Sequence, residues 1–158
     1  MTTKEMIRAY LKDALSWQEA HINFEHAVTE LPKDYRGKKP EGFPYSIWQL
    51  VEHIRIAQWD ILDFTRNPDY KERRWPDDYW PEHLAPENDA AWEQSVSAVI
   101  NDRKAFIKLL DDPDIDLFKP FGHGTGQTLF RQAILIADHT AYHVGQIILI
   151  RKILENTV

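Results

Sequence analysis

The sequence contains no cysteine among its 158 residues. Disulfide bonds, thiolate metal ligands and a cysteine nucleophile are therefore all excluded. The chain also lacks an apolar run close to the roughly 20 residues that a membrane-spanning helix requires. No signal-peptide core follows Met1, because the first residues lead directly into an amphipathic pattern. We therefore expect a cytoplasmic protein that does not enter a membrane.

Concentrated positive charge is also missing. The chain has 19 lysines and arginines against 25 aspartates and glutamates, and a formal net charge of −6. The densest basic group is Lys71, Arg73 and Arg74, whereas binding to nucleic acid phosphates needs a continuous basic face. We therefore exclude nucleic acid as the main partner. Apolar residues make up 43% of the chain, which suits one folded domain over residues 1–158.

Four segments show the three- and four-residue spacing of apolar side chains that is typical of one-sided helices. Thr2 and Glu5 form a capping box at the start of the first segment, and Ser46 and Gln49 form another at the start of the second. No stretch alternates in the manner of a strand, so the sequence predicts an all-α four-helix bundle. The predicted helices cover about residues 2–31, 46–66, 89–111 and 127–154.

The connection over residues 67–87 is unusually long for one without regular structure, and it holds four prolines. Extended at about 3.3 Å per residue, it can return along a helix of about 30 Å. The second and third helices are therefore predicted to run parallel, joined by this crossover. This connection also contains the aromatic residues Trp75, Tyr79 and Trp80. Exposed aromatic side chains indicate either a subunit interface or a lid over a pocket.

His139 and His143 are four residues apart on the fourth predicted helix, so their side chains share one face. Two imidazoles at this spacing can bind one metal ion. The segment lacks the glutamate of the HExxH zinc proteases, which argues against a protease. A solvated or hydrogen-bonded histidine pair is the alternative, but this helix is the most apolar of the four, where unpaired imidazoles are costly to bury.

His53 lies on the inward face of the second predicted helix, between Leu50 and Ala57. A lone histidine there is ordinarily a hydrogen-bonded core residue. With His139 and His143 it supplies a third ligand, and three neutral imidazoles with open positions are typical of a reactive metal site rather than a closed structural one.

Four further polar residues are candidates for secondary roles. His21 and Glu25 lie with Gln18 on the inward stripe of the first predicted helix, which indicates either the wall of a polar cavity or a self-satisfied hydrogen-bond cluster. From that wall, His21 or Glu25 could act as a base beside the metal. His123, between two glycines, faces either the site mouth or solvent, and Gln146 is placed to line the pocket.

Two stretches carry a resemblance to a known family: Trp48-Gln49-Leu50-Val51-Glu52-His53-Ile54 and Asp138-His139-Thr140-Ala141-Tyr142-His143-Val144-Gly145-Gln146-Ile147. They resemble the DinB/YfiT-like superfamily of bacterial four-helix proteins. The resemblance implies an up-down-down-up bundle with a long crossover between helices 2 and 3. It also implies a metal triad from one histidine of the second helix and two of the fourth, here His53, His139 and His143.

The resemblance further implies a homodimer that binds zinc, nickel or a similar ion. Some relatives are thiol S-transferases that use bacillithiol, and a more distant one is a mycothiol-dependent isomerase. We therefore expect a metal-dependent transferase or hydrolase acting on a small molecule, with a low-molecular-weight thiol as a possible partner. The alternatives are a non-catalytic metal- or small-molecule-binding stress-response protein, and a purely structural bundle whose histidines are core hydrogen-bonding residues.

Overall fold

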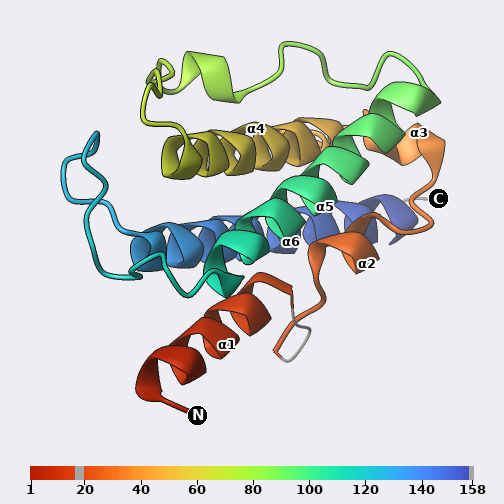
Figure 1. Cartoon of the computed structure of the whole chain (residues 1–158). Helices are drawn as coiled ribbons and strands as arrows, with labels where there is room; N and C mark the ends of the chain where they lie inside the picture. The colour runs from red at the N-terminus through yellow and green to blue at the C-terminus, as the bar shows by residue number, and fades with distance from the viewer. Residues whose placement is uncertain (17–19, 157–158) are drawn as a thin grey trace.

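Four long helices carry the fold of the computed structural model, which describes residues 1–16 and 20–156 (Figure 1). They are α1 (Thr3–Ser16), α4 (Ile47–Arg66), α5 (Asp89–Asp111) and α6 (Leu129–Asn156). Three short helices lie between them: α2 (Phe24–Val28), α3 (Lys33–Arg36) and the 3₁₀ turn η1 (Asp77–Tyr79). The described residues contain no strand, which confirms the predicted all-helical class.

Both predicted capping boxes are present. The backbone N–H of Gln49 donates to Ser46 Oγ and the N–H of Ser46 donates to Gln49 Oε1, each over 3.2 Å. At the start of α1, the N–H of Thr2 donates to Glu5 Oε2 over 2.6 Å and that of Glu5 donates to Thr2 Oγ1 over 3.2 Å. Each box satisfies two donors that lack partners at a helix start, so the local sequence determines where α1 and α4 begin.

The prediction of one helix from residue 2 to residue 31 is wrong. α1 ends at Ser16, residues 20–23 are not helical, and Asn23 caps α2 by accepting from the N–H of His26 over 3.1 Å. An asparagine at this position satisfies a free N–H at the start of a new helix and so competes with helix continuation. The predicted stripe of Gln18, His21 and Glu25 is therefore divided: His21 precedes α2, Glu25 lies in it, and Gln18 lies outside the described residues.

The 67–88 connection is a crossover, as predicted. Figure 1 shows it leaving the end of α4 and returning outside that helix to the start of α5, so that α4 and α5 run in the same direction while α6 runs in the opposite one. α4 packs against both α5 and α6.

The core consists of two apolar clusters. One includes Leu50 and Ile54 of α4 with Val144 and Ile147 of α6. The other begins further along, with Ile61 and Leu62 of α4 and Ala133 and Ile136 of α6. The stretches 55–60 and 137–143 lie between the two clusters, so the middle of the α4–α6 pair is where polar side chains can gather.

α6 is the one helix within the described residues that is long and apolar enough to cross a membrane by length and composition. It packs against α1, α2 and α4. Its buried residues include Leu129, Ala133, Ile136 and Ile150 on one side, which is the pattern of a central bundle helix.

Candidate metal centre

Three histidines meet in the gap between the two apolar clusters. His53 comes from α4, and His139 and His143 come from adjacent turns of α6. One ring nitrogen of each lies within 4.8 Å of those of the other two, and the Nε2 atoms of His53 and His139 are 3.0 Å apart. His53 and His143 are buried, with exposed fractions of 2% and 5%. The predicted three residues therefore form one largely buried cluster.

Two of the histidines have their outer ring nitrogen fixed by an oxygen. His53 Nδ1 lies 2.9 Å from the carbonyl oxygen of Tyr79, and His143 Nδ1 lies 2.7 Å from Gln146 Oε1. A carbonyl or amide oxygen only accepts, so each Nδ1 carries the proton and each Nε2 keeps a lone pair. Partners of this kind are what orient metal-binding histidines.

Burial keeps all three rings neutral. It lowers the pKa of His53 to about 4, with the neighbouring His143 adding to the effect and the Tyr79 hydrogen bond opposing it. Burial and the two neighbouring histidines lower the pKa of His139 to about 3, and burial also lowers the pKa of His143. Near pH 7 all three are in the deprotonated form that binds metals.

The donor set fits a divalent ion. At metal–nitrogen bonds of about 2.1 Å, ligand nitrogens of a tetrahedral or octahedral ion are separated by roughly 3.0 to 3.4 Å. The 3.0 Å between His53 and His139 falls in this range. Three imidazoles suit zinc, nickel, copper and iron alike, so the ligands do not select one of these metals.

The 67–88 connection forms a wall over the cluster. The indole of Trp80 stacks on the His53 ring, with centroids 3.9 Å apart and planes at 4°, and its other neighbour is Tyr45 at 4.0 Å. Trp75 lies further out, 6.4 Å from His53, and is 70% exposed. The position of this connection over the histidines supports the interpretation of its aromatic residues as a lid over a pocket rather than as a subunit interface.

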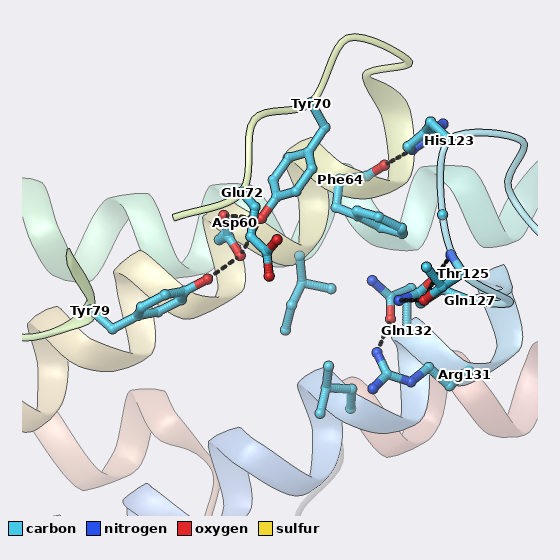
Figure 2. A pocket seen from close by; sticks show the side chains of 13 residues that line it. Asp60, Phe64, Tyr70, Glu72, Tyr79, His123, Thr125, Gln127, Arg131 and Gln132 are labelled. Carbon is cyan, nitrogen blue, oxygen red and sulfur yellow. Dashed lines mark hydrogen bonds between the residues drawn. The ribbon is translucent and has the colours of Figure 1, made fainter. Parts of the chain in front are cut away.

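A cavity of about 300 Å³ adjoins the cluster, and His139 is the histidine that lines it. Its other lining residues are mostly apolar: Ala57, Asp60, Ile61, Trp75, Tyr79 and Leu135. A larger cavity of about 600 Å³ continues from it (Figure 2), because Asp60, Ile61, Tyr79 and Leu135 line both.

Asp60 holds the connection against α4 between the two cavities. This buried carboxylate accepts from the hydroxyl of Tyr79 over 2.7 Å and from that of Tyr70 over 3.0 Å, and Arg73 Nε lies 3.6 Å away (Figure 2). Burial and the Asp60 charge raise the pKa of Tyr70 to about 12 and also raise that of Tyr79. Both tyrosines therefore remain donors. Asp60 was not predicted from the sequence, although it is a carboxylate on the inward stripe of α4, seven residues after His53.

The structure does not bring Glu25 or His21 into the three-histidine cluster. Glu25 pairs with Arg103 through both carboxylate oxygens. Burial raises the pKa of Glu25, but this hydrogen-bonded cation outweighs burial and holds it below its usual value. His21 is exposed, and its Nδ1 lies 2.9 Å from the carbonyl oxygen of Ile22.

Two other predicted residues do contact the site region. Gln146 holds His143, as described above. His123 lines the larger cavity, and its Nε2 lies 2.7 Å from the carbonyl oxygen of Phe64. A Cβ on Gly124 would lie 2.9 Å from Phe64 Cζ, so a glycine is needed for this loop to approach α4. His123 is exposed, and the cavity that it lines is not lined by any of the three histidines of the cluster, so its position at the site mouth stays a prediction.

A sequence model for one protein family, described as the DinB superfamily, matches residues 16–147. The matched span contains the three histidines, Asp60 and the whole 67–88 connection. No curated protein and no solved structure matches the chain.

Proposed function

Since the chain belongs to the DinB superfamily, we propose that it binds one divalent metal ion through His53, His139 and His143 and acts on a small molecule. The proposed reaction is a thiol S-transfer or a hydrolysis, and zinc or nickel is the proposed ion. The observation that carries the proposal is the convergence of three neutral imidazoles, two of which have their outer nitrogens fixed.

A bound divalent ion would supply Lewis-acid chemistry, lowering the pKa of a coordinated thiol or water so that a nucleophile forms without a protein cysteine. The three imidazoles contribute no negative charge, which favours an anionic ligand such as a thiolate. Tyr79, through its carbonyl oxygen, and Gln146 fix the ring orientations of His53 and His143. Trp80 covers the His53 ring and excludes water from that side.

The cavity beside His139 is where the chain would bind its substrate. Ala57, Ile61 and Leu135 give it an apolar wall, and the hydroxyl of Tyr79 and the carboxylate of Asp60 give it a polar one. A small-molecule substrate suits a cavity of about 300 Å³.

Family membership also implies the four-helix bundle. The directions of α1, α4, α5 and α6 in Figure 1 support the proposed up-down-down-up order. We also propose that the protein is a cytoplasmic homodimer and that it has no nucleic acid partner. The formal net charge of −6 supports the absence of a nucleic acid partner.

The test is metal-dependent turnover by protein purified without a histidine tag. Zinc- and nickel-loaded samples are assayed for transfer of small thiols to an electrophile and for hydrolysis of activated esters. We expect turnover that disappears with His53→Ala and persists with His83→Ala, since His83 is an exposed histidine of the connection. Equal turnover in the two variants would contradict a role for the cluster.

The alternative is a non-catalytic protein that binds a metal or a small molecule, for example in a stress response. It uses the same three histidines and is favoured if the loaded protein binds thiols tightly but turns over none of the substrates. The purely structural alternative predicts that neither zinc nor nickel binds.

A further inference from the structure

One face of α6 connects the histidine cluster with a charged residue two turns away. Arg131, Leu135, His139 and His143 follow one another at intervals of four residues, so they lie along the same side of the helix. The eight residues from Arg131 to His139 span about 12 Å of helix axis. Arg131 is therefore well separated from the candidate metal centre but on the same face.

The two adjoining cavities make a groove along this face. The smaller cavity is lined by His139 and the larger by Arg131, and both are lined by Ile61 and Leu135. The part that they share is thus apolar on the α6 side and has Asp60 and Tyr79 on the other. The groove therefore presents a candidate metal at one end, an apolar middle, and a polar far end.

At the far end, Arg131 retains binding capacity. Its Nη1 donates to Oε1 of the buried Gln132 over 2.6 Å. No carboxylate within residues 1–16 and 20–156 forms an ion pair with it. Asp60 is already bonded to Tyr70 and Tyr79, so it is not a partner for Arg131.

Figure 2 shows Arg131 on the α6 side of the larger cavity and Glu72 on the opposite side, with Asp60. Arg131 is an exposed residue whose guanidinium makes one hydrogen bond within the described residues, and a guanidinium that lines a cavity is suited to binding a carboxylate through paired hydrogen bonds.

We propose that Arg131 is a specificity-determining residue that binds a carboxylate of the substrate, about two helix turns along α6 from the candidate metal centre. The substrate is then an elongated small molecule. Its reacting group lies beside His139, its apolar middle contacts Ile61 and Leu135, and its carboxylate pairs with Arg131. This inference rests on the proposed function, because it takes the reacting end to lie at the three histidines.

The test is calorimetric binding of simple thiols to zinc-loaded protein. Omega-mercaptooctanoate has an extended length close to the required span, omega-mercaptooctanol lacks only the charge, and mercaptopropionate keeps the charge on a chain too short to reach. We expect the octanoate to bind at least about tenfold more tightly than the octanol, as for a hydrogen bond to a charged group. Mercaptopropionate should bind to the zinc-loaded protein about as tightly as mercaptopropanol, because its carboxylate cannot reach Arg131.

Variants of Arg131 and Glu72, which line opposite sides of the larger cavity, distinguish a specific contact with the carboxylate from a general effect of charge on binding. Arg131→Gln should remove the preference for the octanoate without weakening the octanol, and Arg131→Lys should restore part of it. Glu72→Gln removes a charge from the same cavity and should preserve or increase the preference. An unchanged preference in Arg131→Gln, or none in wild type, would overturn the proposal.

Failure of the proposed function gives a different result. In that case zinc does not strengthen binding of any thiol, and His139→Ala has no effect. Arg131 is then tested on metal-free protein, with calorimetric binding of octanoate and octanol. Octanoate should still bind more tightly in wild type than in Arg131→Gln, and equal binding would overturn the assignment of Arg131.

Discussion

At the residue scale, the protonation state of three imidazoles decides what the cluster can bind. His53, His139 and His143 are buried close to one another, so each disfavours a charge on the others. The carbonyl oxygen of Tyr79 and the amide oxygen of Gln146 determine which nitrogen keeps its proton. His53 and His143 therefore each keep an Nε2 lone pair available for a metal near neutral pH.

The first prediction concerns the pH dependence of stability in metal-free protein. The folded state holds the pKa of His53 at about 4 and that of His139 at about 3, whereas an unfolded histidine has a pKa of about 6.5. As the pH falls below about 6.5, the unfolded chain gains protons that the folded cluster does not. The free energy of unfolding should therefore decrease between pH 6.5 and pH 4.5 by about 2 kcal/mol for each of these two histidines.

Denaturant titrations at a series of pH values measure this effect. Replacing His53 and His139 together by glutamine should flatten the pH dependence, while His83→Gln should leave it unchanged. A wild-type stability that does not vary over this interval would contradict the burial of neutral imidazoles.

The second prediction concerns Gln146, whose oxygen holds His143 Nδ1. Gln146→Leu leaves the ring without this acceptor, so affinity for zinc should fall about tenfold or more. Competition with a chromophoric chelator measures it. Asn156→Ala, which removes a polar side chain at the far end of the same helix, is the control. Equal affinity in the two variants would show that Gln146 does not position the ligand.

At the element scale, the 67–88 connection is part of the site rather than a linker. It supplies the carbonyl oxygen that holds His53 and the indole that covers it. Its attachment to α4 runs through the two tyrosine hydroxyls that donate to Asp60. Loosening these bonds should therefore open the site.

The third prediction follows from this attachment. Tyr70→Phe combined with Tyr79→Phe leaves the buried Asp60 without two donors, which should lower the free energy of unfolding by about 1 to 3 kcal/mol. Zinc release to excess chelator should also become faster. Tyr10→Phe, on the exposed side of α1, should change neither quantity. Unchanged release in the double variant would mean that the connection does not cover the ion.

Sequence patterns predicted these elements unevenly, for physical reasons. Capping boxes and prolines are local signals, so α4, α5 and the crossover were predicted closely. The separate start of α2 was missed because the apolar spacing continues through Ile22 and Val28, although Asn23 caps a new helix. The histidines were found from periodicity and family resemblance. Asp60 was not, because its tyrosine partners lie in a connection without periodic pattern.

At the scale of the whole molecule, the proposed site occupies the junction between the two apolar clusters. Each cluster holds one half of the α4–α6 pair, and the groove follows the polar interval between them. The solvent-facing side of α6 carries exposed apolar side chains, Ile134, Tyr142 and Leu149, together with Gly145, whose Cβ position has open space around it. We propose that a second copy of the chain covers this face in the homodimer.

The fourth prediction tests that interface. Ile134→Glu combined with Leu149→Glu places two charges on the exposed face of α6 and should convert the dimer to a monomer in sedimentation velocity. Ile22→Glu, at an exposed apolar residue before α2, should remain dimeric. A wild-type monomer, or a dimer that survives the double substitution, would contradict the assignment.

Metal content is the most direct test of the central claim. Protein purified without a histidine tag is incubated with zinc or nickel, desalted and measured by mass spectrometry, beside the His139→Ala, His143→Ala double variant. The cluster of His53, His139 and His143 predicts about one ion per chain in wild type and almost none in the variant. No bound metal in wild type, or equal metal in both proteins, would contradict the three-histidine metal centre.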